Sequence, residues 1–302
     1  MLAIIAPGQG GQTPGMLNSW IADAASQELL IHWSDAISLD LVRLGTSANV
    51  DEIKDTANAQ PLIVATSLIA AHALAVSHVA VVSGHSVGEL TAAALSGALS
   101  REDALTLVRA RGIEMAKAAA LHPAGMSAVL GGERKDVVVA IQSLGLVAAN
   151  ENGAGQIVAA GDLTALASLA ENPPPGARVR ALAVAGAFHT AFMAPAVEPL
   201  REIARGITTH NSGISVISNK DGSVINDGAE ILARIINQIA NPVRWDLCMD
   251  SLESMGITGV IELAPAGTLV GLLKRAHPSI ESFALKSADD LAAAREFAGM
   301  HA

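Results

Sequence analysis

The stretch VAVVSGHSVGELTAAAL, residues 79–95, passes from β-branched residues through a glycine-flanked turn into a run rich in alanine and leucine. β-Branched residues favour strands, whereas Ala and Leu favour helices, so the pattern predicts a strand, a tight turn and a helix. The turn carries the motif Gly-x-Ser-x-Gly, with Ser86 between Gly84 and Gly88. A sharp strand-to-helix turn has room only for small residues beside its tip. We therefore expect the Ser86 hydroxyl to be exposed at a helix N-terminus.

Further apolar runs recur along the chain with helical patterns between them. They are apolar throughout rather than alternating, which is typical of strands buried on both faces of a parallel sheet. The predicted strands are LAIIA (2–6), VAVV (79–82), ISVIS (214–218), GVIEL (259–263) and SFALK (282–286). The helical patterns cover residues 101–121, 191–207, 229–240 and 268–276. The main body is therefore predicted to be α/β.

The order of the predicted strands and helices changes between about residues 125 and 184. There the order of predicted elements is strand, helix, strand, strand, helix, strand, which is the ferredoxin-like pattern. We therefore expect a ferredoxin-like subdomain over residues 125–184. It would be inserted into a larger domain formed by residues 1–124 and 185–302.

The composition excludes several functions. With 302 residues, 51% of them hydrophobic, the chain can bury a sizeable core. A formal net charge of −10 gives no field to hold nucleic acid, and one cysteine excludes an intramolecular disulfide. The N-terminal segment lacks the basic region of a signal peptide. The apolar tract 61–82 is long enough to span a membrane, but polar residues interrupt it, and we predict a helix opened by Pro61 and then a strand. A cytoplasmic location without membrane contact is expected.

A nucleophilic serine needs a base to accept its proton. The chain has nine histidines, and the pattern leaves several of them open. His189 is the best candidate because it follows the predicted insert, in a Gly- and Ala-rich loop that leads into a helix. His85 is interpreted as structural, because adjacent residues on a tight turn point apart.

Five blocks of sequence, in order, resemble the bacterial malonyl-CoA:acyl carrier protein transacylases. They are APGQGGQ near the N-terminus, GHSVGE at 84–89, RARGIEM around Arg111, GAFH before residue 190, and NPVRW at 241–245. The likeness runs from about Leu2 to Lys286 and is greatest to actinobacterial members of type II fatty-acid synthesis. It implies an α/β-hydrolase-like core with a parallel sheet and a ferredoxin-like insert, which the segment pattern also predicts.

The resemblance assigns the catalytic groups residue by residue. It makes Ser86 the nucleophile and His189 its base. The backbone N–H groups of Gln9 and Val87 would form the oxyanion hole, and the backbone carbonyl of Gln238 would orient the histidine. This arrangement needs no aspartate, and the sequence offers no convincing one for a Ser-His-Asp triad.

The resemblance also assigns the substrate site. Arg111 would grip the malonyl carboxylate through two hydrogen bonds, although on pattern alone it also fits a solvated helix arginine. Met115 would lie on the same side of the helix, and Phe188 would press on the malonyl methylene unless it only packs in the core. The implied reaction is ping-pong transfer of malonyl from coenzyme A to the phosphopantetheine thiol of acyl carrier protein. It implies no cofactor and no metal.

Three alternatives remain open at the level of sequence. A serine thioesterase or esterase uses the same turn, but it needs no arginine beside the acyl group. A transacylase of malonate decarboxylase or of a polyketide pathway would share the chemistry and differ in its carrier. A non-catalytic acyl-CoA sensor would bind without forming an acyl-enzyme.

Overall fold

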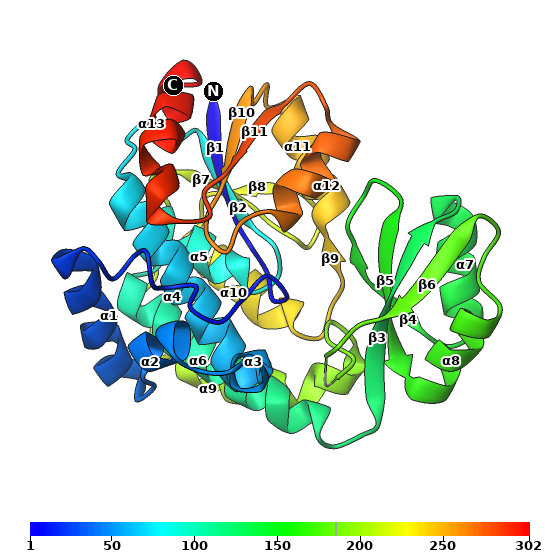
Figure 1. Ribbon diagram of the computed structural model, residues 1–302. Coiled ribbons are helices and arrows are strands. Elements are labelled where there is room, and N and C mark those ends of the chain that lie inside the picture. The colour runs from blue at the N-terminus through cyan, green and yellow to red at the C-terminus, as the bar shows by residue number, and fades with distance from the viewer. Residues whose placement is uncertain (185) are drawn as a thin grey trace.

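The structure, a computed structural model, describes residues 1–184 and 186–302 and has a mixed α/β architecture with two sheets. Figure 1 shows a larger body that carries both termini and a smaller body beside it. The larger sheet has the strand order β11-β10-β1-β2-β7-β8, and all its neighbours are parallel except β7 and β8. Its strands are β1 (Leu2–Ala6), β2 (Val81–Gly84), β7 (Ser215–Ile217), β8 (Val224–Ile225), β10 (Gly259–Glu262) and β11 (Glu281–Ala284).

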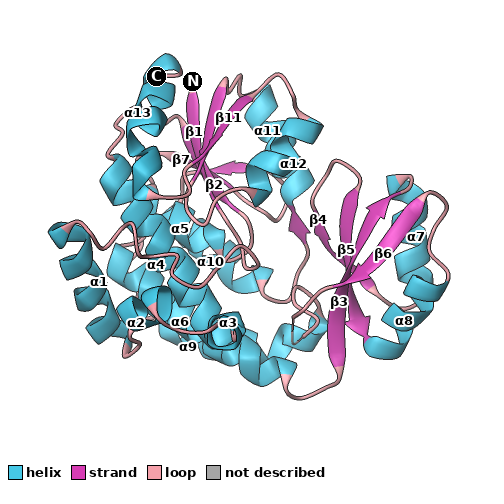
Figure 2. Cartoon of the chain, viewed as in Figure 1, coloured by secondary structure: helices cyan, strands magenta, loops and turns pink. Residues whose placement is uncertain are grey.

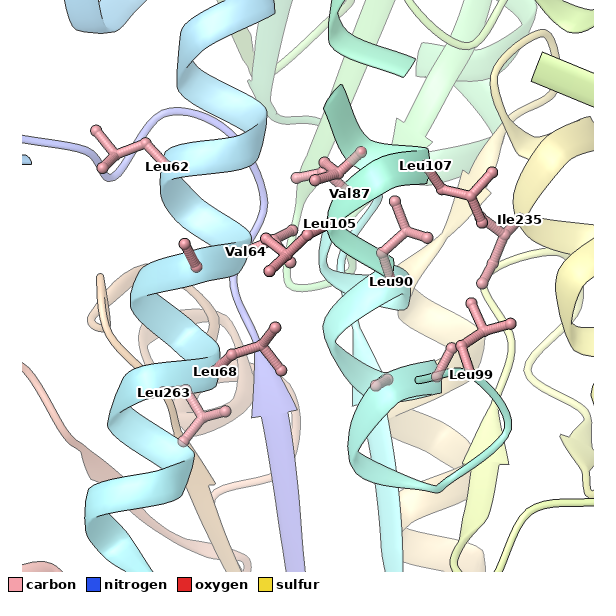
Figure 3. Close-up of a cluster of buried hydrophobic side chains, with 14 of the residues drawn as sticks. Leu62, Val64, Leu68, Val87, Leu90, Leu99, Leu105, Leu107, Ile235 and Leu263 are labelled. Atoms are coloured by element: carbon pink, nitrogen blue, oxygen red, sulfur yellow. The ribbon is translucent and has the colours of Figure 1, made fainter. Parts of the chain in front are cut away.

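Helices cover both faces of this sheet, which is why its strands are apolar throughout. Along β1, Leu2 and Ile4 belong to one hydrophobic cluster, and Ala3 and Ile5 belong to the cluster on the opposite face. The second face packs against α11 (Trp245–Ser254) and α12 (Thr268–Ala276). The cluster on the first face also contains side chains from α1 (Ala24–Ile37), α2 (Leu41–Thr46), α4 (Thr56–Leu74), α5 (Gly88–Leu95), α6 (Arg101–Ala119), α9 (Ala194–Ala204), α10 (Gly228–Gln238) and α13 (Leu291–Met300). Part of that larger core, between α4, α5 and α10, is drawn in Figure 3.

The smaller sheet has the order β6-β3-β5-β4-β9. Its first four strands come from one segment, pair antiparallel, and are β3 (Ala124–Gly131), β4 (Val147–Glu151), β5 (Gln156–Asp162) and β6 (Ala177–Ala181). The helices α7 (Arg134–Ser143) and α8 (Leu163–Glu171) cover the face turned away from the larger body, as Figure 2 shows, and enclose a separate small core. The fifth strand, β9 (Val243–Arg244), comes from the C-terminal part of the chain and pairs parallel to β4. This pairing of β9 with β4 therefore connects the two bodies.

Three short elements complete the chain: α3 (Val50–Lys54), η1 (Ala191–Met193) and η2 (Ala288–Asp290). Most predicted elements lie within a few residues of their expected positions, and β1 and α12 have the predicted bounds. The predicted boundary between 184 and 185 reaches Ala185, which lies outside the described residues.

The prediction that Pro61 opens a helix is wrong. The helix α4 begins at Thr56, and its N-cap Asp55 accepts a hydrogen bond from the Ala57 N–H. Proline inside a helix leaves the carbonyl four residues earlier without its usual partner. Here that carbonyl, of Ala57, accepts a hydrogen bond of 2.8 Å from Arg109 on α6, so the helix continues through the proline.

Within the described residues, α4 is also the one helix long and apolar enough to cross a membrane. However, 72% of its most apolar window is buried inside the protein. It lies in the first-face cluster between α5, α6 and α13, so it serves as a core helix.

Candidate functional site

The turn between β2 and α5 holds Ser86 at the carboxyl edge of the larger sheet. Ser86 has a φ of 52°, in the left-handed region that non-glycine residues rarely adopt. A side chain at Gly84 would collide with the backbone of Gly88, and one at Gly88 would collide with the carbonyl of Ala6. Both glycines are therefore required by close backbone approach. The Ser86 N–H donates to Asn219 Oδ1 at 2.7 Å, which fixes the strained turn from the neighbouring strand.

The predicted serine and histidine are in contact. Ser86 Oγ lies 2.7 Å from His189 Nε2, and His189 Nδ1 lies 2.8 Å from the backbone carbonyl of Gln238. Because a carbonyl only accepts, Nδ1 carries the proton and Nε2 is free to accept the proton of the serine. His189 is held in a left-handed conformation, with a φ of 62°, and its N–H donates to the Ile239 carbonyl. Among the residues that the structure describes, no carboxylate accepts a hydrogen bond from the His189 ring.

The pKa of His189 is lowered to about 3, first by burial and then by the positive charge of Arg111. Burial penalises the imidazolium, and a nearby cation opposes it further. The imidazole is thus neutral at physiological pH, which is the state a general base needs.

Arg111 lies on α6 with its side chain 1% exposed. Its guanidinium donates to Ser86 Oγ at 3.2 Å, to Gln60 Oε1 at 2.7 Å and to the side-chain carbonyl of Gln238 at 3.0 Å. Within the described part of the chain, its Nε–H has no hydrogen-bond partner. Burial lowers the pKa of Arg111 to about 10, and the charge of Glu89 acts in the opposite direction. The side chain is therefore a buried cation directly beside Ser86 Oγ.

A cavity of about 250 Å³ opens onto these groups. The other predicted site residues, Gln9, Val87, Met115 and Phe188, line it. No hydrogen bond between the described residues uses the backbone N–H of Gln9 or of Val87. The remaining walls come from the segment after β1, from α4, from the smaller body, and from α12 and the loop before it. They include Gly8, Gly10, Gln60, Met126, Asn150, Asn152, Val158, Leu182, Pro265, Thr268 and Leu272. The site thus lies between the two bodies. All the predicted residues except Gln238 line this cavity, and Gln238 contacts two of them, His189 and Arg111.

Three polar residues in the site were not assigned a role from sequence. Glu89 and Asn219 are buried beside the turn, and Gln60 binds the guanidinium. Asn219 follows β7, which is parallel to β2, and the carboxyl ends of parallel neighbours meet at one edge of a sheet. Because Asn219 directly follows the strand predicted over residues 214–218, its position at this edge of the sheet could have been inferred from the sequence. Within the described residues, no group of three or more His, Cys, Asp or Glu side chains is placed to hold a metal ion.

Comparison with known proteins identifies the family. A family model described as "Acyl transferase domain" matches residues 4–297. The chain belongs to the acyl transferase domain family. This acyl transferase domain is 49% identical over 296 residues to a malonyl CoA-acyl carrier protein transacylase of Mycobacterium tuberculosis, covering 96% of the chain and 98% of the relative.

Two solved structures are similar to this acyl transferase domain over almost their whole length. The crystal structure of MCAT from Mycobacterium tuberculosis aligns with a TM-score of 0.94 and 48% identity, covering 98% of this chain and 99% of that one. A malonyl-transacylase in complex with its type II PKS acyl-carrier protein aligns with a TM-score of 0.91 and 26% identity. The alignment covers 98% of this chain and 99% of that one.

Proposed function

We propose that this protein transfers the malonyl group from malonyl-CoA to the phosphopantetheine thiol of acyl carrier protein, through a malonyl-serine intermediate, and so supplies extender units for fatty-acid synthesis. One observation carries the proposal: Ser86 Oγ contacts both His189 Nε2 and the guanidinium of Arg111. The first contact serves acyl transfer in general, and the second places a buried cation where an acyl group ending in a carboxylate would bind. The names of the similar proteins support the same reaction.

The first half-reaction uses only groups of the protein. His189 Nε2 takes the proton of Ser86 as Oγ attacks the thioester carbonyl carbon. The resulting oxyanion would accept hydrogen bonds from the backbone N–H groups of Gln9 and Val87, which line the cavity. As the tetrahedral intermediate collapses, the carbon–sulfur bond breaks and His189 protonates the departing thiolate, releasing coenzyme A.

The second half-reaction reverses these steps with the thiol of the carrier as nucleophile. His189 takes the proton of that thiol as the thiol sulfur attacks the carbonyl carbon of the malonyl-serine ester. The bond between that carbon and Ser86 Oγ then breaks, and His189 returns the proton to Oγ. The solved complex of a similar malonyl-transacylase with its acyl-carrier protein supports a carrier as the acceptor. No cofactor enters either half-reaction, and we propose a cytoplasmic location for the enzyme.

Substrate choice would be made by three side chains around the acyl group. Arg111 would bind the malonyl carboxylate with the planar donor geometry that suits a carboxylate. Phe188, 7% exposed and lining the cavity, would pack against the methylene group and disfavour a branching methyl. Met115, 1% exposed, would close the apolar side of the acyl site.

We also propose a domain division. Residues 1–124 and 185–302 would form an α/β-hydrolase-like catalytic domain, and residues 125–184 a ferredoxin-like subdomain. The order β6-β3-β5-β4, the antiparallel pairing and the separate small core support the ferredoxin-like assignment. The strand-turn-helix around Ser86 supports the hydrolase-like one.

The experiment is intact-protein mass spectrometry after brief mixing with malonyl-CoA, followed by addition of holo acyl carrier protein. We expect a malonyl-sized mass increase on Ser86 that moves to the carrier, and no adduct on Ser86→Ala. An adduct that decays to free malonate regardless of the carrier would instead identify a hydrolase. A malonyl adduct on Ser86→Ala would exclude this serine as the nucleophile.

A further inference from the structure

Glu89 is a buried carboxylate that the proposed reaction does not use. It lies in the first turn of α5, three residues after the nucleophile, and is 3% exposed. Its Oε1 accepts the backbone N–H of Asn219 at 2.6 Å, and its Oε2 accepts the side-chain amide of Gln238 at 2.6 Å. Burial raises the pKa of Glu89 to about 7, whereas the hydrogen bond from the Asn219 N–H and the charge of Arg111 favour its ionised form.

Both partners of Glu89 are donors, and each faces a different carboxylate oxygen. An ionised carboxylate accepts at both oxygens, whereas an amide of the same shape accepts at one end and donates at the other. Glutamine at position 89 would therefore oppose a donor to either the Asn219 N–H or the Gln238 amide. The position requires a carboxylate for reasons of hydrogen bonding, beyond its charge.

The carboxylate in turn fixes the orientation of the Gln238 side chain. Its Nε2 faces three acceptors: Glu89 Oε2, Asn219 Oδ1 at 3.1 Å and the Ser86 carbonyl at 3.3 Å. Its Oε1 must then point the other way, where it accepts from Arg111 at 3.0 Å. A reversed amide would place its own donors against the guanidinium. Glu89 thus acts on Arg111 through one intervening amide.

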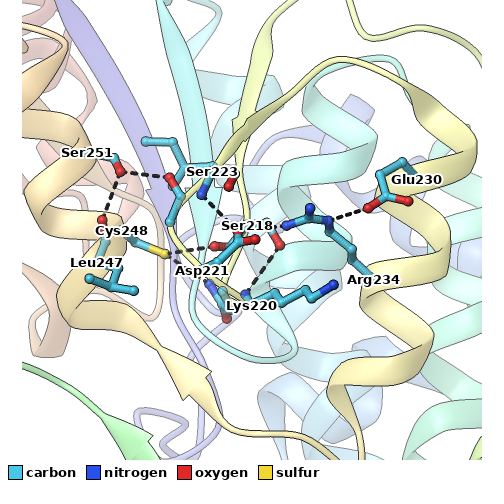
Figure 4. Close-up of polar contacts among 12 residues, drawn as sticks. Ser218, Lys220, Asp221, Ser223, Glu230, Arg234, Leu247, Cys248 and Ser251 are labelled. Atoms are coloured by element: carbon cyan, nitrogen blue, oxygen red, sulfur yellow. Dashed lines mark hydrogen bonds and ion pairs between the residues drawn. The ribbon is translucent and has the colours of Figure 1, made fainter.

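The loop that carries Asn219 is itself held on several sides, as Figure 4 shows. Asp221 pairs with Arg234 at 2.7 Å, Ser251 donates to the Gly222 carbonyl at 2.7 Å, and the Cys248 thiol donates to the Ser218 carbonyl at 3.4 Å. The side chain of Asn219 donates to the Gly84 carbonyl at 2.8 Å. Glu89 therefore bonds to a loop that further hydrogen bonds and an ion pair hold in place.

We propose that the Glu89 carboxylate and the side-chain amide of Gln238 position Arg111 beside Ser86, and thereby set the preference for acyl groups that end in a carboxylate. This inference rests on the proposed function and deepens it. Gln238 then has two separate roles: its backbone carbonyl holds His189, and its side chain holds Arg111. One terminal nitrogen of the Arg111 guanidinium donates to Gln60. The other donates to Gln238 and to Ser86 Oγ, so the group is held on both sides.

The two roles of Gln238 are separable by experiment, because a substitution keeps the backbone carbonyl. We would measure the rates of acylation by malonyl-CoA and by acetyl-CoA for the wild type, Glu89→Gln and Gln238→Met, all of which fill similar space. A hydrogen bond to a charged group is worth a factor of roughly 10 to 100 in rate. We expect the ratio of malonyl to acetyl rates to fall by that factor in both variants, with the acetyl rate of Glu89→Gln within about threefold of the wild type.

Glu171→Gln, an exposed glutamate on α8, is the matched control and should leave both rates unchanged. An unchanged rate ratio in Glu89→Gln or Gln238→Met, or an equal loss of both rates, would overturn the inference. A wild-type protein that forms no malonyl adduct would overturn the proposed function instead, so the two failures are distinguishable.

A crystal structure of the wild-type malonyl-enzyme tests the same inference without any variant. We expect Gln238 Oε1 to remain within hydrogen-bond distance of Arg111 while the guanidinium binds the malonyl carboxylate. A guanidinium that has left Gln238 in that state would contradict the positioning role.

Discussion

Arg111 combines burial, charge and a fixed donor geometry in one side chain. Its planar guanidinium contacts two glutamine side-chain carbonyls and Ser86 Oγ at once. A lysine carries the same charge but has no planar fork, so it cannot reproduce these contacts together. The shape of the guanidinium, and not only its charge, is therefore matched to its surroundings.

Arg111→Lys should consequently lower the preference for malonyl over acetyl by roughly 10-fold to 100-fold, and Arg111→Ala by more. An acyl-enzyme should still form from acetyl-CoA, because Ser86 and His189 remain in place. Rates of acylation with the two thioesters provide the measurement. Arg109→Lys, on the same helix but outside the cavity lining, is the control. Unchanged selectivity in Arg111→Ala would remove this arginine from the site.

His189 gives the folded protein a pH dependence whose direction follows from its lowered pKa. An imidazole in the unfolded chain titrates near 6.5, whereas the folded pKa is about 3. Between these values the unfolded chain binds a proton that the folded chain does not. The free energy of unfolding contributed by His189 is therefore fully present above pH 6.5 and falls as the pH falls towards 3, by at most about 1.4 kcal/mol per pH unit.

Urea unfolding at pH 7 and pH 5 measures this contribution. On going from pH 7 to pH 5, we expect the free energy of unfolding of the wild type to fall by about 2 kcal/mol more than that of His189→Asn. Asparagine tolerates the left-handed backbone at this position, so the variant adds little strain. Equal losses in the two proteins would show that the histidine is not buried in its neutral form.

At the scale of the element, the close packing of α5 against β1 overrides helix propensity. Gly88 is the first residue of α5, where alanine would ordinarily favour the helix by about 1 kcal/mol. However, an added methyl group would meet the carbonyl oxygens of Ala6 and Pro7. Backbone atoms cannot move aside as a flexible side chain does, so the turn would have to open.

Gly88→Ala should therefore destabilise the protein by about 2 kcal/mol or more and abolish acylation, because the turn positions Ser86. Gly271→Ala in α12 is the matched control. Its methyl group would meet only the end of the Arg275 side chain, at an ordinary 3.8 Å. We expect that variant to be as stable as the wild type or up to about 1 kcal/mol more stable. Thermal and urea unfolding distinguish these outcomes, and a stabilised Gly88→Ala would contradict the close approach.

At the scale of the whole molecule, the active site depends on the contact between the two bodies. His85, in the turn beside Ser86, lies 2.9 Å from Asn152 Oδ1, just after β4 of the smaller sheet. The pKa of His85 is lowered by burial, so its ring is neutral and donates to the amide oxygen. This bond and the pairing of β4 with β9 fix the smaller sheet over the cavity.

Asn152→Ala should cost about 1 to 3 kcal/mol of stability, because it leaves the N–H of a partly buried imidazole without a partner. We also expect a higher KM for malonyl-CoA, with the preference for malonyl over acetyl unchanged, since Arg111 is not touched. Asn172→Ala, at an exposed position of the same body, should change stability by less than about 0.5 kcal/mol. If both variants behave alike, the contact between His85 and Asn152 does not hold the bodies together.

Local patterns in the sequence determined the elements and the turn. β1 and α12 have their predicted bounds, and the helix and strand on either side of Ser86 were expected, because apolar runs and glycine positions act over a few residues. The start of α4 was missed for a physical reason. The carbonyl freed by Pro61 is satisfied by Arg109, which is distant in sequence.

Local patterns along the chain thus predict an α/β protein with an exposed serine at a glycine-flanked turn, and the family resemblance assigns the histidine base and the arginine. The contacts among these groups depend on the folded molecule. Ser86 and His189 are 103 residues apart, and Glu89 is 130 residues from Asn219 and 149 from Gln238. Hydrophobic periodicity and turn chemistry describe neighbours along the chain. Contacts between buried polar groups from distant segments are set by the packing of the sheet and its helices, and so they appear only in the folded molecule.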